Sequence, residues 1–267
     1  MRTIDNVNEL LGGDHCGELP RGLADRTFGD QRTELALAAK ELRIRDPRPA
    51  PGGSDTLAYF LQWPEEVLMM TDTPRYALSF TAGALLASEA AVVAPVYLRK
   101  RDWAATRDRV KDENLLQGRV ARSNVRILGA LIPRLQTLSE AELAIVSEGT
   151  STDRGHLMWV AACRRYVLIA QFAEEVLRER FLTLAGTVSY EDYDSFYRGK
   201  AMWHEELDGV TDLTFKKLRQ VLFKMMVEAG LLTGHGQIEP VLLSPRVAEC
   251  LNQRTPSDIR FFPTSVA

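Results

Sequence analysis

The sequence has 267 residues, of which 45% are hydrophobic and 26% charged, and its formal net charge is -3. This composition excludes a chain that is disordered throughout, and a mean hydropathy of -0.16 excludes a protein with several membrane spans. The three cysteines, Cys16, Cys163 and Cys250, form no C-x-x-C pair, which excludes a disulfide framework and a cysteine-rich zinc module. The polar start of the chain lacks a signal-peptide pattern, so we expect a cytoplasmic protein.

The net charge is distributed unevenly along the chain. Residues 1–73 carry 8 Lys or Arg against 13 Asp or Glu, whereas residues 74–267 carry 25 Lys or Arg against 23 Asp or Glu. The first part should therefore repel polyanions, while the second part is mildly basic.

Residues 1–73 also differ from the rest of the chain in their pattern. They contain one helical pattern, from Arg32 to Leu42, which is followed by a segment rich in proline and glycine at residues 46–53. Such a segment cannot hold a helix or a central strand. We interpret residues 1–73 as an acidic extension that is partly disordered. The alternative is that translation begins at Met69 or Met70.

Helical signals dominate from Tyr76 onward. Asp102 can cap a helix, Ser139 and Glu142 form a capping box, and a weaker box begins at Ser189. We therefore predict a mainly α protein of about seven to ten helices. The helices expected most clearly are 103–114, 124–135 (with Pro133 as a kink or end), 191–197, 204–207, 215–229 and a last helix that starts at Ser244-Pro245.

The segment Tyr76–Leu98 is the one candidate for a membrane span. Its 23 residues are long enough to cross a bilayer. However, Glu89 near its centre costs about 2.5–3.5 kcal/mol on insertion, whereas each Leu, Phe or Val returns only about 0.3–0.6 kcal/mol. We predict a core helix instead, in which Glu89 requires an arginine or hydrogen-bond partner. The pair Arg164-Arg165 lies in the most apolar region and is the candidate for that internal ion pair.

The predicted helix 215–229 has two contrasting faces. One stripe is apolar and consists of Phe215, Leu218, Leu222, Met225 and Ala229. The opposite side clusters Lys216, Lys217, Gln220 and Lys224, with Arg219 at its edge. Basic residues on an exposed helix face are more often simply solvated than bound to DNA, so the face alone does not identify a site.

The residues after this helix add to the signal. Beyond Gly230 the apolar period changes to about two, and Gly234-His235-Gly236 can form a tight turn, so we predict a small β-hairpin over 231–242. A helix pair, a basic third helix and a hairpin are the outline of a winged helix-turn-helix, in which the third helix enters the DNA major groove. Further basic groups that could contact phosphate are Arg99, Lys100, Arg101, Arg119, Arg122 and Arg126.

Catalytic signatures are missing from the sequence. It contains no G-x-G-x-x-G, P-loop, G-x-S-x-G or H-E-x-x-H motif, and its four histidines lie far from one another and from the cysteines. We therefore expect a protein that is not an enzyme and that has no catalytic residues, metal site or cofactor.

Five motifs lie in order between residues 75 and 263: Tyr76–Leu86 (YALSFTAGALL), Glu113–Gln117 (ENLLQ), Cys163–Tyr166 (CRRY), Lys216–Leu222 (KKLRQVL) and Leu242–Pro245 (LLSP). In this order they resemble the BrxA family of bacterial BREX phage-exclusion systems. The resemblance implies a small, mostly helical, non-enzymatic component of a defence operon that also encodes a DNA methyltransferase, an ATPase and a phosphatase-like protein. Residues 1–73 fall outside the family pattern.

The resemblance also bears on the fold and on DNA binding. Family members are described as DNA-binding, with winged-helix character and a likeness to NusB-type helical proteins, while older labels called them putative inner-membrane proteins. The cost of placing Glu89 in a membrane favours the DNA-binding description over the inner-membrane label. No list of base-contacting residues is carried over from the family.

These observations give the organisation and function that we expect. The chain should comprise the extension 1–73, a helical, NusB-like domain at 74–188 and a winged-helix-like region at 189–267. It should be a double-stranded-DNA-binding accessory protein of a BREX system, with other BREX components as partners and no membrane attachment. The alternative is a protein–protein scaffold that never contacts DNA, which the near-neutral charge of residues 74–267 favours.

Overall fold

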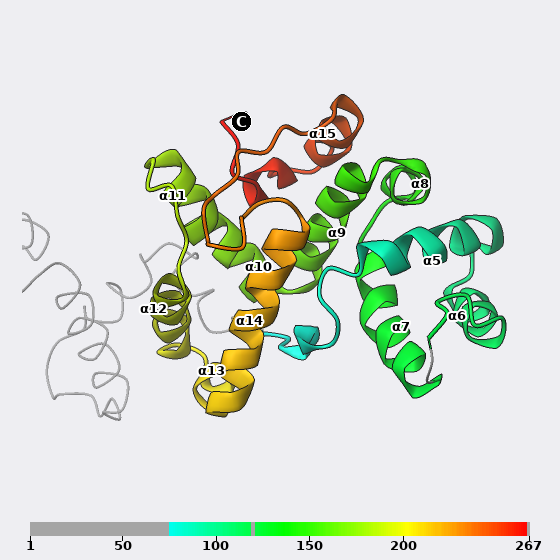
Figure 1. The fold of residues 1–267 in the computed structure, drawn as a ribbon, viewed down its shortest axis with the longest axis horizontal. Coiled ribbons are helices and arrows are strands. Elements are labelled where there is room, and N and C mark those ends of the chain that lie inside the picture. The colour runs from blue at the N-terminus through cyan, green and yellow to red at the C-terminus, as the bar shows by residue number, and fades with distance from the viewer. Residues whose placement is uncertain (1–74, 119–120, 266–267) are drawn as a thin grey trace, which may run out of the picture. The chain divides into compact units, whose positions relative to one another are not determined.

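In the computed structural model of the protein, the described residues are 75–118 and 121–265. They all lie within one unit, Asp72–Ala267. The predicted extension 1–73 and the candidate contact residue Arg119 lie outside the described residues. Most of the helices are connected by short loops, and the connection between α14 and α15, residues 229–244, is longer (Figure 1).

The order of the helical elements confirms the predicted mainly α class. They are η3 (Ser79–Thr81), α5 (Ala87–Lys100), α6 (Trp103–Asp112), α7 (Ala121–Leu135), α8 (Glu140–Glu148), α9 (Ser151–Arg165), α10 (Val167–Phe172), the π-helical η4 (Ala173–Arg178), α11 (Glu179–Leu182), α12 (Tyr190–Ala201), α13 (Glu205–Asp208), α14 (Asp212–Glu228), α15 (Pro245–Asn252) and η5 (Asp258–Phe261). Asp102 caps α6, and both predicted capping boxes, at Ser139 and Ser189, are formed. The predicted division between residues 188 and 189 stays a prediction, as do the NusB likeness and the winged-helix character.

The helix predicted over Tyr76–Leu98 is shorter than expected. It begins only after Leu86, because Leu86 has a left-handed backbone (φ 61°) that cannot continue a right-handed helix. The preceding Leu85 is fully buried, and its backbone N–H donates to the Glu228 carboxylate on α14 at 2.8 Å. Leu85 and Leu86 therefore enter the core from the loop between η3 and α5. No helix within the described residues is long and apolar enough to cross a membrane.

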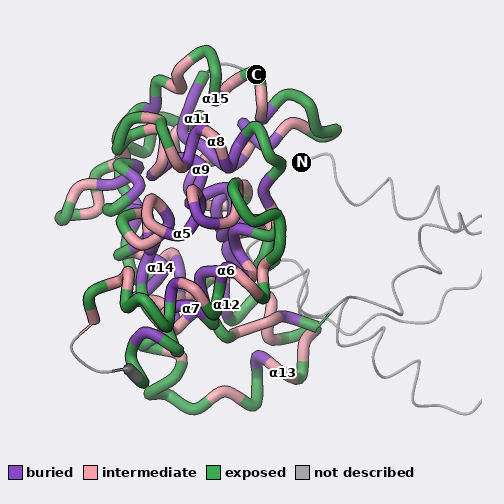
Figure 2. The backbone as a smooth tube through the Cα atoms, turned by 90° about the vertical axis from the view of Figure 1, so that its right-hand side faces the viewer, coloured by how far each residue is buried: buried purple, intermediate pink, exposed green. Residues whose placement is uncertain are grey.

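Helix α9 forms the centre of the core. All of its residues from Gly155 to Cys163 are buried, and it contacts α5, α7, α8, α10 and α14. Buried residues accordingly gather around α9 in Figure 2, while exposed residues lie along the outer segments. The Trp159 indole Nε1–H donates to the Phe261 carbonyl at 2.9 Å, which attaches the C-terminal η5 to the centre of the core.

The predicted β-hairpin is wrong, because the described residues contain no β-strand. A turn is present, and Leu232 pairs with Ile238 in an isolated antiparallel bridge. The pairing does not extend, since Pro240 lacks the N–H that a longer ladder requires. Gln237 also forms an isolated bridge with Thr187. Residues 237 and 238 therefore pair with two different segments and do not form one hairpin.

The predicted partner of Glu89 is also wrong. Arg164 binds Glu142 and Asp258, with nitrogen–oxygen distances of 2.6 and 2.8 Å, and all three side chains are at most 5% exposed. Its neighbour Arg165 is exposed. Glu89 is half-buried and has no ion-pair partner among the described residues. The buried cluster of Arg164, Glu142 and Asp258 connects α9, α8 and η5 and is called the buried ion cluster below.

Candidate nucleic-acid interface

The exposed side of α14 carries the basic residues that its sequence pattern predicted. Lys216, Lys217, Gln220 and Lys224 are all exposed, and we call them the lysine face of α14 (α14 is orange in Figure 1). The predicted apolar stripe lies on the opposite side, where Leu218, Leu222, Met225 and Ala229 are buried and Phe215 is half-buried. Burial of this stripe fixes the rotation of α14 and directs the lysines to solvent.

Two lysines of this face have acidic neighbours one turn away. The Lys216 Nζ lies 4.0 Å from Asp212, and the Lys224 Nζ lies 3.6 Å from Glu228. Both lysine side chains are more than 60% exposed, and such i,i+4 pairs contribute only about 0.3–0.5 kcal/mol. The Lys217 Nζ has no acidic partner among the described residues and donates to the Gln220 side chain at 3.0 Å. The lysine face is therefore open to a polyanion.

Arg219 differs from the lysines beside it. Its guanidinium donates to both carboxylate oxygens of Asp194 on α12, at 2.6 and 2.7 Å, and its side chain is only 18% exposed. It also lies 4.3 Å from the centre of the Tyr190 ring. These contacts hold α14 against α12, so the Arg219 guanidinium is already paired within the fold.

A second basic region lies around the ends of α5 and α7, on the right of Figure 1 and away from α14. Arg99 and Lys100 are exposed at the C-terminal end of α5, while Arg101 pairs with Glu140. Arg122 and Arg126 are exposed on α7. The structure thus places the candidate phosphate contacts in two groups rather than along one continuous helix face.

One of these arginines borders a cavity of about 180 Å³. The cavity is lined by Ser79, Ala82, Arg126, Gly129, Ala130, Pro133, Arg165 and Tyr166, and we call it the arginine cavity. Arg165 is a surface residue, whereas the sequence pattern predicted one internal ion pair for Arg164 and Arg165 together. The signal that separates them is the rotation of about 100° between successive helical residues, which directs neighbours to different faces.

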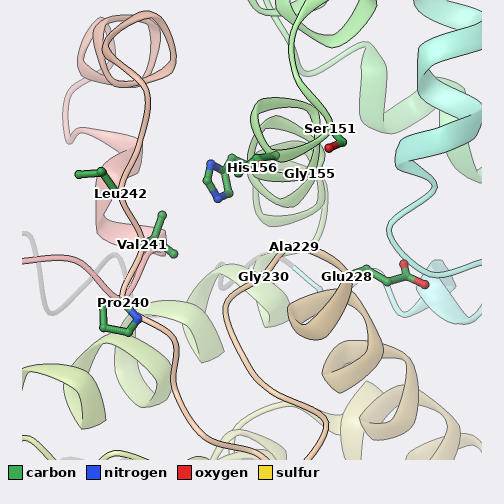
Figure 3. Close-up of a pocket in the computed structure, with 10 residues that line it drawn as sticks. Ser151, Gly155, His156, Glu228, Ala229, Gly230, Pro240, Val241 and Leu242 are labelled. Atoms are coloured by element: carbon green, nitrogen blue, oxygen red, sulfur yellow. The ribbon is translucent and has the colours of Figure 1, made fainter.

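A larger cavity, of about 350 Å³, lies between the start of α9 and the end of α14 (Figure 3). His156 lines it from α9, is only 4% exposed, and has an Nδ1 atom without a hydrogen-bond partner. Burial lowers the pKa of His156 below its ordinary value of 6.5, so the imidazole is neutral at pH 7. No pattern in the sequence pointed to this histidine, since the other side of the cavity comes from residues 228–230 and 240–242, far away in sequence.

Of the two cysteines that the structure describes, Cys163 is buried and Cys250 is half-buried. Burial raises the pKa of the Cys163 thiol well above its ordinary value, which keeps it protonated and a poor nucleophile. Within residues 75–118 and 121–265, no three His, Cys, Asp or Glu side chains gather where they could hold a metal ion.

Comparison with known proteins places this fold in a family. The BrxA family model matches residues 74–255, about two thirds of the chain. The chain belongs to the BrxA family. This membership confirms the family resemblance found in the sequence.

Individual BrxA relatives are distant in sequence. "BREX protein BrxA" of Escherichia coli O9:H4 (strain HS) is 23% identical over 148 residues, which are 55% of this chain and 70% of the relative. "BREX protein BrxA" of Bacillus cereus (strain H3081.97) is 25% identical over 146 residues, 54% of this chain and 73% of the relative. The crystal structure of an uncharacterized protein from Magnetospirillum magneticum has a similar fold, with a TM-score of 0.62 at 22% identity over 71% of this chain and all of that one.

The BrxA match includes both basic regions. The lysine face of α14 and the arginine cavity lie within residues 74–255, whereas the acidic residues 1–73 lie outside the match.

Proposed function

We propose that this BrxA-family chain is a non-enzymatic component of a BREX phage-defence system and that it binds double-stranded DNA. Two relatives carry the name BREX protein, which supports the first part. The lysine face of α14 supports the second, because three ammonium groups point to solvent from a helix whose other side is anchored in the core. The protein partners that we propose are the methyltransferase, the ATPase and the phosphatase-like component of such a system.

The proposed contact follows from the geometry of α14. The helix lies along or in a groove, and Lys216, Lys217 and Lys224 neutralise phosphates. Gln220 lies between them on the same face, and its amide can donate to and accept from a base edge. Arg219 supports this contact indirectly by holding α14 on α12. The Arg99–Arg101 group and Arg122 contribute further phosphate contacts if the duplex extends over α5 and α7.

A gel-shift titration of duplex DNA over a range of salt concentrations tests the proposal. With about five phosphate contacts, the logarithm of the association constant should fall with the logarithm of salt concentration at a slope of about -4 to -5. Lys216→Gln combined with Lys224→Gln should reduce the magnitude of that slope by about 2. Affinity that is insensitive to salt would contradict the proposal.

The matched control is Arg198→Gln combined with Arg246→Gln. Both arginines are exposed, have no acidic partner among the described residues, and lie outside the two basic regions. The control changes the net charge by the same amount as the lysine variant. An equal loss of affinity in the two variants would show that α14 is not the contact surface.

The second candidate function is a protein–protein scaffold without DNA contact. It is favoured by the near-neutral charge of residues 74–267, which carry 25 Lys or Arg against 23 Asp or Glu, because strong DNA binders are usually more basic. Co-purification with operon partners after nuclease treatment, together with no shift of free DNA, would support the scaffold and contradict DNA binding.

A further inference from the structure

Three segments line the arginine cavity, and together they suit an anion. Helix α7 contributes Arg126 and Gly129, the C-terminal end of α9 contributes Arg165, and the loop region at η3 contributes Ser79. No acidic side chain is among the lining residues. Neither Arg126 nor Arg165 has an ion-pair partner among the residues that the structure describes. The cavity is therefore bordered by two guanidinium groups whose charge is not neutralised within the fold.

This arrangement contrasts with that of the adjacent arginine. Arg164 is fully engaged, since it binds Glu142 and Asp258 and also donates to the Thr137 carbonyl. Arg165 instead lies with its guanidinium 5.6 Å from the centre of the Tyr166 ring, and Tyr166 itself lines the cavity. The contrast matters because exposed arginines near carboxylates are commonly neutralised, whereas Arg165 remains available to a ligand.

A third guanidinium, that of Arg134, lies close to Tyr166 of this site. Arg134 lies 5.5 Å from the centre of the same Tyr166 ring and is completely buried. One of its nitrogens donates to the Ala84 carbonyl, while its Nε and Nη2 have no hydrogen-bond partner. A buried charge that is only partly satisfied acts over a short distance with little screening. Arg134 therefore adds positive charge next to Tyr166, which the nearby Glu228 carboxylate partly offsets.

Gly129 lines the cavity without contributing a side chain. It lies in the interior of α7, where glycine is about 1 kcal/mol less favourable than alanine. A Cβ atom placed at Gly129 would meet no other atom within 4 Å, so no close packing against a neighbour requires glycine there. The absence of a side chain leaves room for a ligand to approach the helix between Arg126 and Pro133.

We propose that the arginine cavity binds one backbone phosphate of duplex DNA, with Arg126 and Arg165 donating to its oxygens. The planar fork of arginine matches the geometry of a phosphate, and the Ser79 hydroxyl supplies a further donor. Arg122 is exposed one turn before Arg126 and continues the positive track along α7. This inference rests on the proposed DNA binding and adds to it a contact that the lysine face of α14 does not provide.

The test compares Arg126→Gln combined with Arg165→Gln against the control Arg198→Gln combined with Arg246→Gln, in salt titrations with duplex DNA. We expect the cavity variant to lose about 10- to 100-fold in affinity at low salt and to reduce the magnitude of the salt slope by about 1, which corresponds to one phosphate. The control should lose much less. Equal losses would overturn the cavity assignment while leaving DNA binding intact. A wild-type chain that binds no DNA would overturn both proposals.

Gly129→Leu tests the same site without a change of charge. A leucine at this exposed helical position should fill the cavity and raise helix propensity, so the melting temperature should not fall. We expect a loss of DNA affinity similar to that of the cavity variant. Unchanged affinity in this variant would overturn the proposal.

Inorganic phosphate distinguishes DNA from a free anion as the ligand. Melting curves are compared in sodium phosphate and in sodium chloride at equal ionic strength. If phosphate stabilises the wild-type chain but not the cavity variant, and both bind DNA equally, the cavity holds a free anion and the DNA assignment is overturned.

Discussion

At the scale of single residues, Arg164 and Arg165 show how far local sequence determines a role. Both are arginines in the most apolar part of the chain, and the sequence argument assigned both to an internal ion pair. The structure bears this out for Arg164 alone, with Glu142 and Asp258 as its partners. Asp258 follows Arg164 by 94 residues, and no local pattern reports a contact over that distance. The exposure of Arg165 could have been anticipated only from the helix rotation.

The buried ion cluster yields the first prediction. Arg164→Ala should lower the free energy of unfolding by about 3–5 kcal/mol, because Glu142 would remain buried without a counterion and Asp258 would keep only its longer contacts with Arg254 and Arg260. Urea denaturation followed by circular dichroism measures this change. The matched control Arg165→Ala should alter stability by about 0.5 kcal/mol or less. Similar effects of the two substitutions would contradict the assignment of roles.

The second prediction concerns pH and His156. Burial lowers its pKa in the folded state below 6.5, so the unfolded chain binds the proton more readily. The contribution of the neutral imidazole to the free energy of unfolding is fully present above about pH 6.5. It is lost as the pH falls through the folded-state pKa, and the free energy of unfolding then decreases by at most about 1.4 kcal/mol per pH unit. Nearby Asp153 partly opposes this shift. His156→Gln should flatten the fall in stability between pH 7 and 5, and the same fall in both proteins would contradict the prediction.

At the scale of elements, capping and amphipathic patterns were reliable guides, because both depend on residues within one turn. The start of α6, the two capping boxes and the buried stripe of α14 are all formed as predicted. The hairpin failed because its pairing depends on a third segment, around Thr187, that lies far away in sequence. The predicted early start of α5 was wrong for a similar reason, since the Leu85 N–H donates to Glu228 of α14, which lies far away in sequence. The arginine cavity also escaped prediction, because it exists only where α7 packs on α9.

The pairing of α12 with α14 yields the third prediction. Arg219→Ala should destabilise the fold by about 1.5–3 kcal/mol, since it leaves the largely buried Asp194 carboxylate without its charged hydrogen-bond partner. Asp194→Arg combined with Arg219→Asp should recover part of this loss in a double-mutant cycle measured by urea denaturation. If Arg219→Ala leaves stability unchanged but weakens DNA binding, Arg219 contacts DNA directly.

At the scale of the whole molecule, charge is separated between two parts of the chain. The residues matched to the BrxA family belong to a mildly basic part, while residues 1–73 carry an excess of five negative charges. The sequence established this separation completely, because counting charges requires no knowledge of the fold. It does not show which surface carries the positive charge, and that information comes from the packing of α7, α9 and α14.

This separation yields the fourth prediction. A chain that begins at residue 74 should bind duplex DNA more tightly than the full chain at low salt, because it lacks the acidic residues that repel phosphate. The difference should shrink as salt rises toward 0.15 M, where the screening length is about 8 Å. Fluorescence anisotropy with a labelled duplex measures both affinities. Equal affinities at low salt would show that residues 1–73 exert no field on the binding surface.

The bond from Trp159 to Phe261 has a consequence for synthesis of the protein. Trp159 lies in the middle of the core, yet its partner Phe261 follows it by 102 residues, and Asp258 follows Arg164 by 94. Helix α9 is therefore synthesised long before η5 exists. The bonds from Trp159 and Arg164 to η5 can form only once that segment has been made, so the centre of the core is completed late in folding.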